Sequence, residues 1–109
     1  MVGNGAPLEE SLRKVLREGR DWQRFPVKGV PGVFILKAPA YRGRPASLII
    51  EVNPVGPDGA PTKRRGLMLR NVSELEEYRR LLSAERLVEV LKAVEKVNPQ
   101  REAGEEFEV

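Results

Sequence analysis

The stretch PGVFILKAPAYRGRPASLIIEV, residues 31–52, decides the fold of this chain. Residues 31–39 are apolar on both alternating faces and are flanked by prolines, which is typical of a central β-strand. The segment YRGRP follows as a turn in which Gly43 provides backbone freedom. Residues 46–52 then return as a second apolar strand. The stretch therefore predicts two antiparallel strands joined by a short connection.

The flanking segments extend this pair into a small sheet with a helix at each end. RDWQRFPVKG, before it, predicts an edge strand or irregular segment because Pro26 limits regular pairing. After it, the Pro- and Gly-rich residues 53–63 predict a long turn, and RRGLMLR predicts another strand. Residues 8–19 show helical spacing and end at Gly19. We therefore predict an α+β fold, with an antiparallel sheet of three to four strands, an N-terminal helix and a long C-terminal helix.

The predicted strand at residues 64–70 has two different faces. Leu67 and Leu69 are expected to face the core, while Met68 and the neighbouring cations lie on the opposite face or where the strand begins. Gly66 has no side chain, so we expect it to leave room for a ligand close to the backbone.

The C-terminal segment, residues 73–98, has a helical pattern throughout. Ser73 followed by Glu76 matches a capping box. The apolar stripe changes phase near Ser83, which allows one bent helix or two shorter helices. The stripe is wider than one face of a small sheet requires, so we predict a homo-oligomer, dimer or tetramer, built through this helix. The alternative is a helix packed in the core of its own domain.

Charge is unevenly distributed along the chain. The net charge is +3, but residues 20–70 hold ten cations against three anions, whereas residues 71–109 hold six cations against ten glutamates. The sharpest concentration is KRR, residues 63–65, with no acidic neighbour. Such segregation indicates a partner for the basic part of the chain.

Aromatic side chains recur beside these cations, for example Trp22 between Arg20 and Arg24. Single-stranded nucleic acid requires both residue types, because unpaired bases stack on aromatic rings and phosphates attract Lys and Arg. A duplex hides its base faces, so the pattern favours single strands. The candidate nucleic-acid-binding residues are Trp22, Arg24, Phe25, Phe34, Tyr41, Arg42, Arg44, Lys63, Arg64 and Arg65.

Structural explanations compete at several of these positions. Trp22 and Phe25 could be core residues, and Phe34 lies on a strand that is apolar on both sides, which favours a core position. The KRR run could serve only to keep a strand edge from aggregating. The combination of these residues with the basic segment is more specific than any one of them.

The composition argues against an enzyme. The chain has no cysteine and no histidine, which removes disulfides, thiol nucleophiles, imidazole bases and thiolate metal sites. Neither GNG nor GPDG is a phosphate-cradling loop. We therefore expect no catalytic residue, no metal and no cofactor. The absence of cysteine and the lack of a signal-peptide or membrane-spanning pattern predict a cytoplasmic protein, and the excess of Arg and Glu leans toward a thermophile.

The order of elements in ASLIIEVNPVGPDGAPTKRRGLMLRNVSELEEYRRLL is similar to the single-strand-binding domain of the positive-cofactor-four transcription coactivators, over about a third of the chain. The whole chain more closely resembles the archaeal ThermoDBP-related proteins. That resemblance implies sequence-independent binding of single-stranded DNA between subunits. It places Trp22, Phe25, Phe34 and Tyr41 on an apolar floor and Arg42, Arg44, Lys63, Arg64 and Arg65 against phosphates. The chain departs from the family in size, with a short acidic end.

We therefore predict a single nucleic-acid-binding domain, residues 1–98, that includes the oligomerisation helix, followed by a flexible acidic tail, residues 99–109. Its predicted function is sequence-independent binding of single-stranded DNA. Two alternatives remain: an RNA-binding or coactivator-like module, and a protein-interaction adaptor with a basic face.

Overall fold

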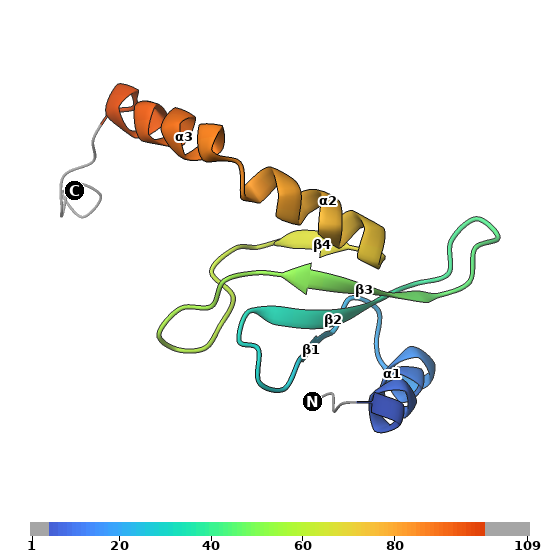
Figure 1. Ribbon diagram of the computed structural model, residues 1–109. Helices are drawn as coiled ribbons and strands as arrows, with labels where there is room; N and C mark the ends of the chain where they lie inside the picture. Colours follow the sequence, from blue (N-terminus) through green and yellow to red (C-terminus); the bar gives the residue numbers. More distant parts are fainter. Residues whose placement is uncertain (1–4, 100–109) are drawn as a thin grey trace. The chain divides into compact units, whose positions relative to one another are not determined.

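The computed structural model describes residues 5–99. Its helices are α1 (Gly5–Glu18), α2 (Val72–Leu82) and α3 (Glu85–Val97), and its strands are β1 (Arg24–Pro26), β2 (Val33–Ala38), β3 (Ser47–Val52) and β4 (Leu67–Leu69) (Figure 1). The predicted α+β class, the antiparallel sheet and the helix at each end are confirmed. Most of the predicted tail, residues 100–109, lies outside the described residues.

The four strands form an antiparallel meander in the order β1-β2-β3-β4. Residues paired across neighbouring strands share a face. We call one side the Arg24 face; its members are Arg24, Pro26, Phe34, Leu36, Ile49, Glu51 and Met68. The other side is the Phe25 face; its members include Phe25, Ile35, Ile50 and Leu69. Met68 therefore lies opposite Leu67 and Leu69, as predicted.

The core is concentrated on the two central strands. Its buried apolar side chains are Phe34, Ile35, Leu36, Ile49 and Leu69. The continuous apolar run of β2 is explained by burial on both faces of the sheet. The predicted strand over residues 64–70 is shorter in the structure, because only Leu67–Leu69 pair with β3. The KRR segment, residues 63–65, is therefore part of the preceding loop.

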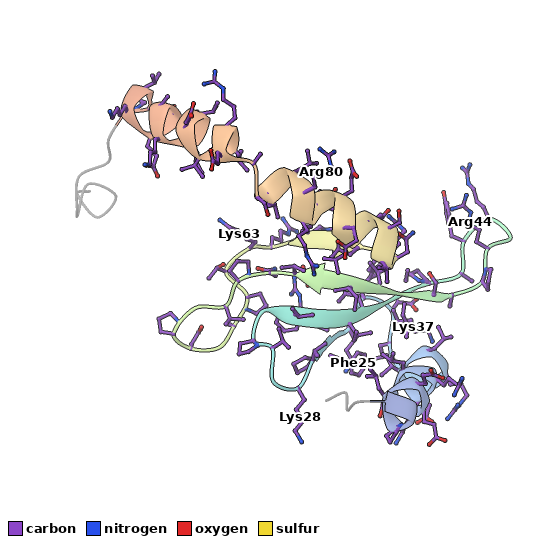
Figure 2. The ribbon with its side chains drawn as sticks, in the orientation of Figure 1. Phe25, Lys28, Lys37, Arg44, Lys63 and Arg80 are labelled. Carbon is purple, nitrogen blue, oxygen red and sulfur yellow. The ribbon has the colours of Figure 1, made fainter. Side chains whose placement is uncertain are left out.

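Helix α1 ends where the sequence predicts, and its end lies on the Phe25 face. The Gly19 N–H donates to the Val15 carbonyl at 2.8 Å and closes the last turn. A Cβ at Gly19 would lie 3.1 Å from the Phe25 ring, and Lys37 Nζ donates to the Gly19 carbonyl at 3.2 Å. Figure 2 shows Phe25 and Lys37 beside this helix. The Phe25 face is thus the side that meets α1.

The chain divides into two compact units, Met1–Glu74 and Leu75–Val109. The second contains most of α2 and all of α3, which are separated at Ser83 and Ala84. The Ser83 hydroxyl donates to the Arg79 carbonyl at 2.7 Å as α2 ends. The phase change near Ser83 therefore marks two helices. No residue of α2 or α3 is buried.

The start of α2 differs from the prediction. The Asn71 side chain accepts the Glu74 N–H at 2.8 Å, and the Glu74 carboxylate accepts the Arg70 N–H at 2.7 Å. The predicted capping box at Ser73 and Glu76 is wrong, because Asn71 already caps the helix two residues earlier, and Asn is among the best N-cap residues.

Candidate nucleic-acid interface

The KRR segment has a fixed backbone and free side chains. The Asn53 side chain brackets Lys63, since its Nδ2 donates to the Lys63 carbonyl at 2.8 Å and its Oδ1 accepts the Lys63 N–H at 3.1 Å. The Gly66 N–H donates to Glu51 Oε2 at 2.7 Å. Asn53 and Glu51 are fully buried, whereas residues 63–65 are exposed. The end of β3 thus holds the loop and leaves its three cationic residues exposed.

An ion pair between the buried Glu51 and the partly exposed Arg24 supports this arrangement. Arg24 Nε donates to Glu51 Oε1 at 2.6 Å, and Arg24 Nη2 donates to Glu51 Oε2 at 3.2 Å. The hydrogen bond from Arg24 lowers the pKa of Glu51 to about 2; burial opposes this shift, and the Gly66 N–H and the Asn53 amide reinforce it. Glu51 therefore remains ionised at neutral pH although its side chain is 0% exposed.

Arg24 is a positioning residue in the structure. Besides its pair with Glu51, its Nη2 donates to the Arg64 carbonyl at 2.8 Å. Its guanidinium, predicted to be part of the nucleic-acid-binding surface, is thus engaged by a carboxylate and by the loop backbone. The physical reason is that a buried carboxylate requires a charged partner, and Arg24 reaches it across β2. Arg64 and Arg65, which line the same cavity as Glu51, have no carboxylate partner within residues 5–99.

Gly66 also has a different role from the predicted one. A Cβ at this position would lie 2.2 Å from the Val52 carbonyl oxygen and 2.8 Å from Asn53 Cβ. The close neighbour of the Gly66 backbone is therefore strand β3 of the same chain. Glycine at this position allows the loop to approach the sheet closely enough for the hydrogen bond to Glu51.

Trp22 is exposed and strained. Its φ is 62°, in the left-handed region that a bulky side chain rarely adopts, at a cost of about 1–3 kcal/mol. Its N–H donates to the Lys37 carbonyl at 2.8 Å, which fixes the turn against β2. The side chain is 52% exposed.

Trp22 lines a cavity of about 230 Å³ together with Arg24, Leu36, Glu51, Arg64, Arg65 and Met68. The structure thus joins Trp22 to the KRR segment on the Arg24 face.

Tyr41, Arg42 and Arg44 form a second group at the tip of the β2–β3 hairpin. Tyr41 and Arg44 exchange two backbone hydrogen bonds, and Arg42 and Gly43 between them have φ of 47° and 79°, as in a type I′ turn. Tyr41 is 66% exposed, and the Arg42 guanidinium lies 5.3 Å from its ring centre. Figure 2 shows Arg44 and Lys63 at opposite ends of the sheet. The predicted cations therefore form two groups.

Two of the predicted aromatic residues, Phe34 and Phe25, lie away from the exposed rings. Phe34 lies on the Arg24 face but is only 7% exposed, because it is part of the core between Pro26 and Glu51. Phe25 is on the opposite face, against the end of α1. Burial argues against Phe34 as a stacking platform, Phe25 is half-buried on the face away from the KRR segment, and Trp22 and Tyr41 are the exposed rings of the predicted set.

The pairing of charges separates the helices from the sheet loops. On the helices, arginines at 13, 17, 79, 80 and 86 pair with nearby glutamates. Within residues 5–99, the only ion pair of the sheet region is Arg24 with Glu51. Arg42, Arg44 and the KRR segment have no carboxylate partner among these residues. Both groups that carry an exposed aromatic ring therefore contain unneutralised cations, and Lys14, Lys28 and Arg70 likewise have no carboxylate partner among the described residues.

Sequence reasoning missed Glu51 and Asn53 as parts of the site. The available signal was the position of Glu51, a single carboxylate in the otherwise apolar strand SLIIEV. An ionised side chain inside an apolar strand requires a cationic partner from elsewhere in the fold. That rule predicts a partner without identifying it, since Arg24 is 27 residues away in sequence.

The described residues contain no group of three or more Asp, Glu, Cys or His side chains that could hold a metal ion. None of the helices within residues 5–99 is long and apolar enough to cross a membrane. No protein-family model, curated protein or solved structure matches this chain.

Proposed function

We propose that this protein binds single-stranded nucleic acid, DNA foremost, without sequence preference. The observation that carries the proposal is the coincidence of unneutralised cations with exposed aromatic rings. Trp22 accompanies the KRR segment, and Tyr41 accompanies Arg42 and Arg44. Rings offer stacking surfaces to any base, and the cations attract phosphates through counterion release. Neither contact reads a base edge, so binding is indifferent to sequence.

The hairpin-tip group and the KRR group are far enough apart to contact one nucleic-acid strand that lies along the sheet. The hairpin tip precedes β3 and the KRR loop follows it, and the six residues of β3 extend about 20 Å at roughly 3.3 Å per residue. A flexible single strand can meet both groups by lying along the sheet. A single strand also exposes its bases to Trp22 and Tyr41, whereas a duplex keeps its bases stacked.

The proposal includes self-association through α2 and α3. Their large apolar side chains are exposed: Leu75, Tyr78, Leu81, Leu82, Leu87, Val88, Val90, Leu91, Val94 and Val97. Leu87, Val90, Val94 and Val97 follow the three-four spacing of a helix-pairing stripe. Three arginines of these helices, Arg79, Arg80 and Arg86, pair with glutamates of their own helix, so these charges do not require an oppositely charged partner. A second copy of the same chain is therefore the proposed occupant.

On this proposal the protein is a binding protein with no catalytic role, and membership of the ThermoDBP-related family stays part of the proposal. RNA binding and an adaptor role are the outcomes that would replace it. An adaptor would use the same cations to meet an acidic protein, and would show no dependence on oligonucleotide length.

The test is fluorescence anisotropy with labelled oligo-dT at several salt concentrations, with duplex DNA and oligo-rU as competitors. The variant replaces Lys63, Arg64 and Arg65 with alanine. Their side chains have no hydrogen-bond or ion-pair partner within residues 5–99, and the backbone bonds are retained, so the fold should persist. Each phosphate contact on a single strand contributes about 0.7 to the salt slope, so the variant should lose about 2.

The matched control replaces Arg13, Lys14 and Arg17 of α1, which removes the same charge from a helix where two of the three are paired. It should leave the salt slope within about 0.5 of the parent value. Equal affinity and slope in the KRR variant would refute the role of this segment. No binding of oligo-dT at low salt would refute the proposed function, and stronger competition by oligo-rU would replace DNA with RNA.

A further inference from the structure

The cavity beneath Trp22 has features that a flat stacking surface does not require. Its volume is about 230 Å³, below the range of roughly 300–1,000 Å³ that holds a drug-sized ligand. Trp22, Leu36 and Met68 supply apolar wall, and Arg64 and Arg65 supply positive charge. The space suits one flat ring bearing an anionic group nearby.

The backbone at Trp22 is held in the conformation that forms this cavity. Its positive φ is unfavourable for tryptophan, and the hydrogen bond to the Lys37 carbonyl maintains it. The ring remains half-exposed, so burial in the core does not account for the strained turn. Backbone strain of this kind concentrates at ligand-binding positions.

The floor of the cavity does not repel an anion. Glu51 lines it, but its two carboxylate oxygens accept hydrogen bonds from Arg24, Asn53 and the Gly66 N–H. Every buried polar side-chain atom in the described part of the chain has a hydrogen-bond partner. Arg64 and Arg65 have no carboxylate partner within residues 5–99. A phosphate near these two arginines therefore meets uncompensated positive charge.

We propose that this cavity is a pocket for a single unstacked nucleobase, which lies against Trp22 with Leu36 and Met68 around it, while its phosphate meets Arg64 or Arg65. The inference rests on the proposed function and deepens it, because it assigns one nucleotide of the strand to a defined pocket in each chain. It also predicts that an isolated nucleotide binds, which a purely electrostatic surface does not require.

The test uses Trp22 as its own reporter, since it is the single tryptophan of the chain. Thymidine monophosphate is titrated at low salt while tryptophan emission is followed, with inorganic phosphate and thymidine as separate controls. Stacking should quench the emission in a saturable manner. Phosphate alone should not quench it, and thymidine should require a higher concentration because it lacks the contact with arginine.

The matched variant is Trp22→Gly, which removes the ring and relieves the positive φ, so the fold should be retained. Its affinity for oligo-dT should fall roughly 5- to 150-fold, the range for loss of one stacked base, with an unchanged salt slope. Tight oligo-dT binding combined with no quenching and no effect of Trp22→Gly would overturn the pocket and leave the proposed function intact. Failure of the parent chain to bind any oligonucleotide would overturn both.

Discussion

Replacing Glu51 with glutamine tests how the interface is held together. The side chain is fully buried, and all its partners are donors: Arg24, the Asn53 amide and the Gly66 N–H. Glutamine keeps the shape but presents an NH₂ group to at least one of these donors. The variant therefore loses a charge-assisted bond and leaves a buried donor unsatisfied.

The magnitude follows from the pKa of Glu51, which is about 2 in the folded chain against the ordinary 4.5. At about 1.4 kcal/mol per pKa unit, this difference corresponds to about 3 kcal/mol of folding free energy. Because the folded-state pKa is depressed, the contribution is fully present above about pH 4.5 and is lost as the pH falls toward 2. The stability difference between parent and Glu51→Gln should follow the same course.

The assay is urea denaturation followed by circular dichroism, at fixed protein concentration, at pH values from 7 to 2.5. The parent should be about 3 kcal/mol more stable than Glu51→Gln at pH 7, and this gap should narrow below about pH 4.5. Glu9→Gln is the control, because Glu9 is exposed and pairs with Arg13 on the helix surface. Its effect should stay below about 0.5 kcal/mol. A gap for Glu51→Gln that does not change with pH would refute the charge-based explanation.

Two further variants test the helical part of the chain. Asn71→Ala should lower the free energy of unfolding by about 1 kcal/mol in the same urea assay, because it removes the acceptor for the Glu74 N–H. Ser73→Ala should change it by less than about 0.5 kcal/mol. A larger effect of Ser73→Ala than of Asn71→Ala would support the cap predicted from the sequence. Val90→Lys with Val94→Lys should convert the proposed oligomer to a monomer in sedimentation equilibrium, because two charges would be buried in the helix-pairing stripe. Lys92→Ala, at a position between them, should leave the parent mass, and a parent chain that is already monomeric would refute self-association.

The strands and the hairpin were predictable because their signals are local. The apolar run of β2 and the turn around Gly43 determine a strand and its return without reference to the rest of the chain. The phase change at Ser83 likewise depends only on helical spacing. The cap of α2 was mispredicted because Asn71 and Ser73 are both good capping residues, and local sequence alone does not rank them.

The interface was only partly predictable because it depends on contacts between distant residues. The charge pattern pointed to the KRR segment, but the sequence did not tell which of the aromatic residues are exposed. It could not identify the pairing of Arg24 with Glu51, which requires the register of three strands. Nor could the sequence tell which face of the sheet Phe25 and Phe34 occupy, because a shift of one residue in a strand moves every side chain to the opposite face.

The buried carboxylate explains how three consecutive cations can be presented without a partner. Glu51 is the one acidic side chain in the strands, and it does not neutralise the KRR segment; it binds Arg24 and the Gly66 N–H instead. The backbone of the loop is thereby fixed by part-buried hydrogen bonds with Asn53 and Glu51, while the three like charges repel one another in solvent. On the proposed function, a bound phosphate chain would relieve that repulsion without needing to order the loop. Preorganisation of this kind reduces the entropic cost of binding, so the network around Glu51 would contribute to affinity although it need not touch the nucleic acid.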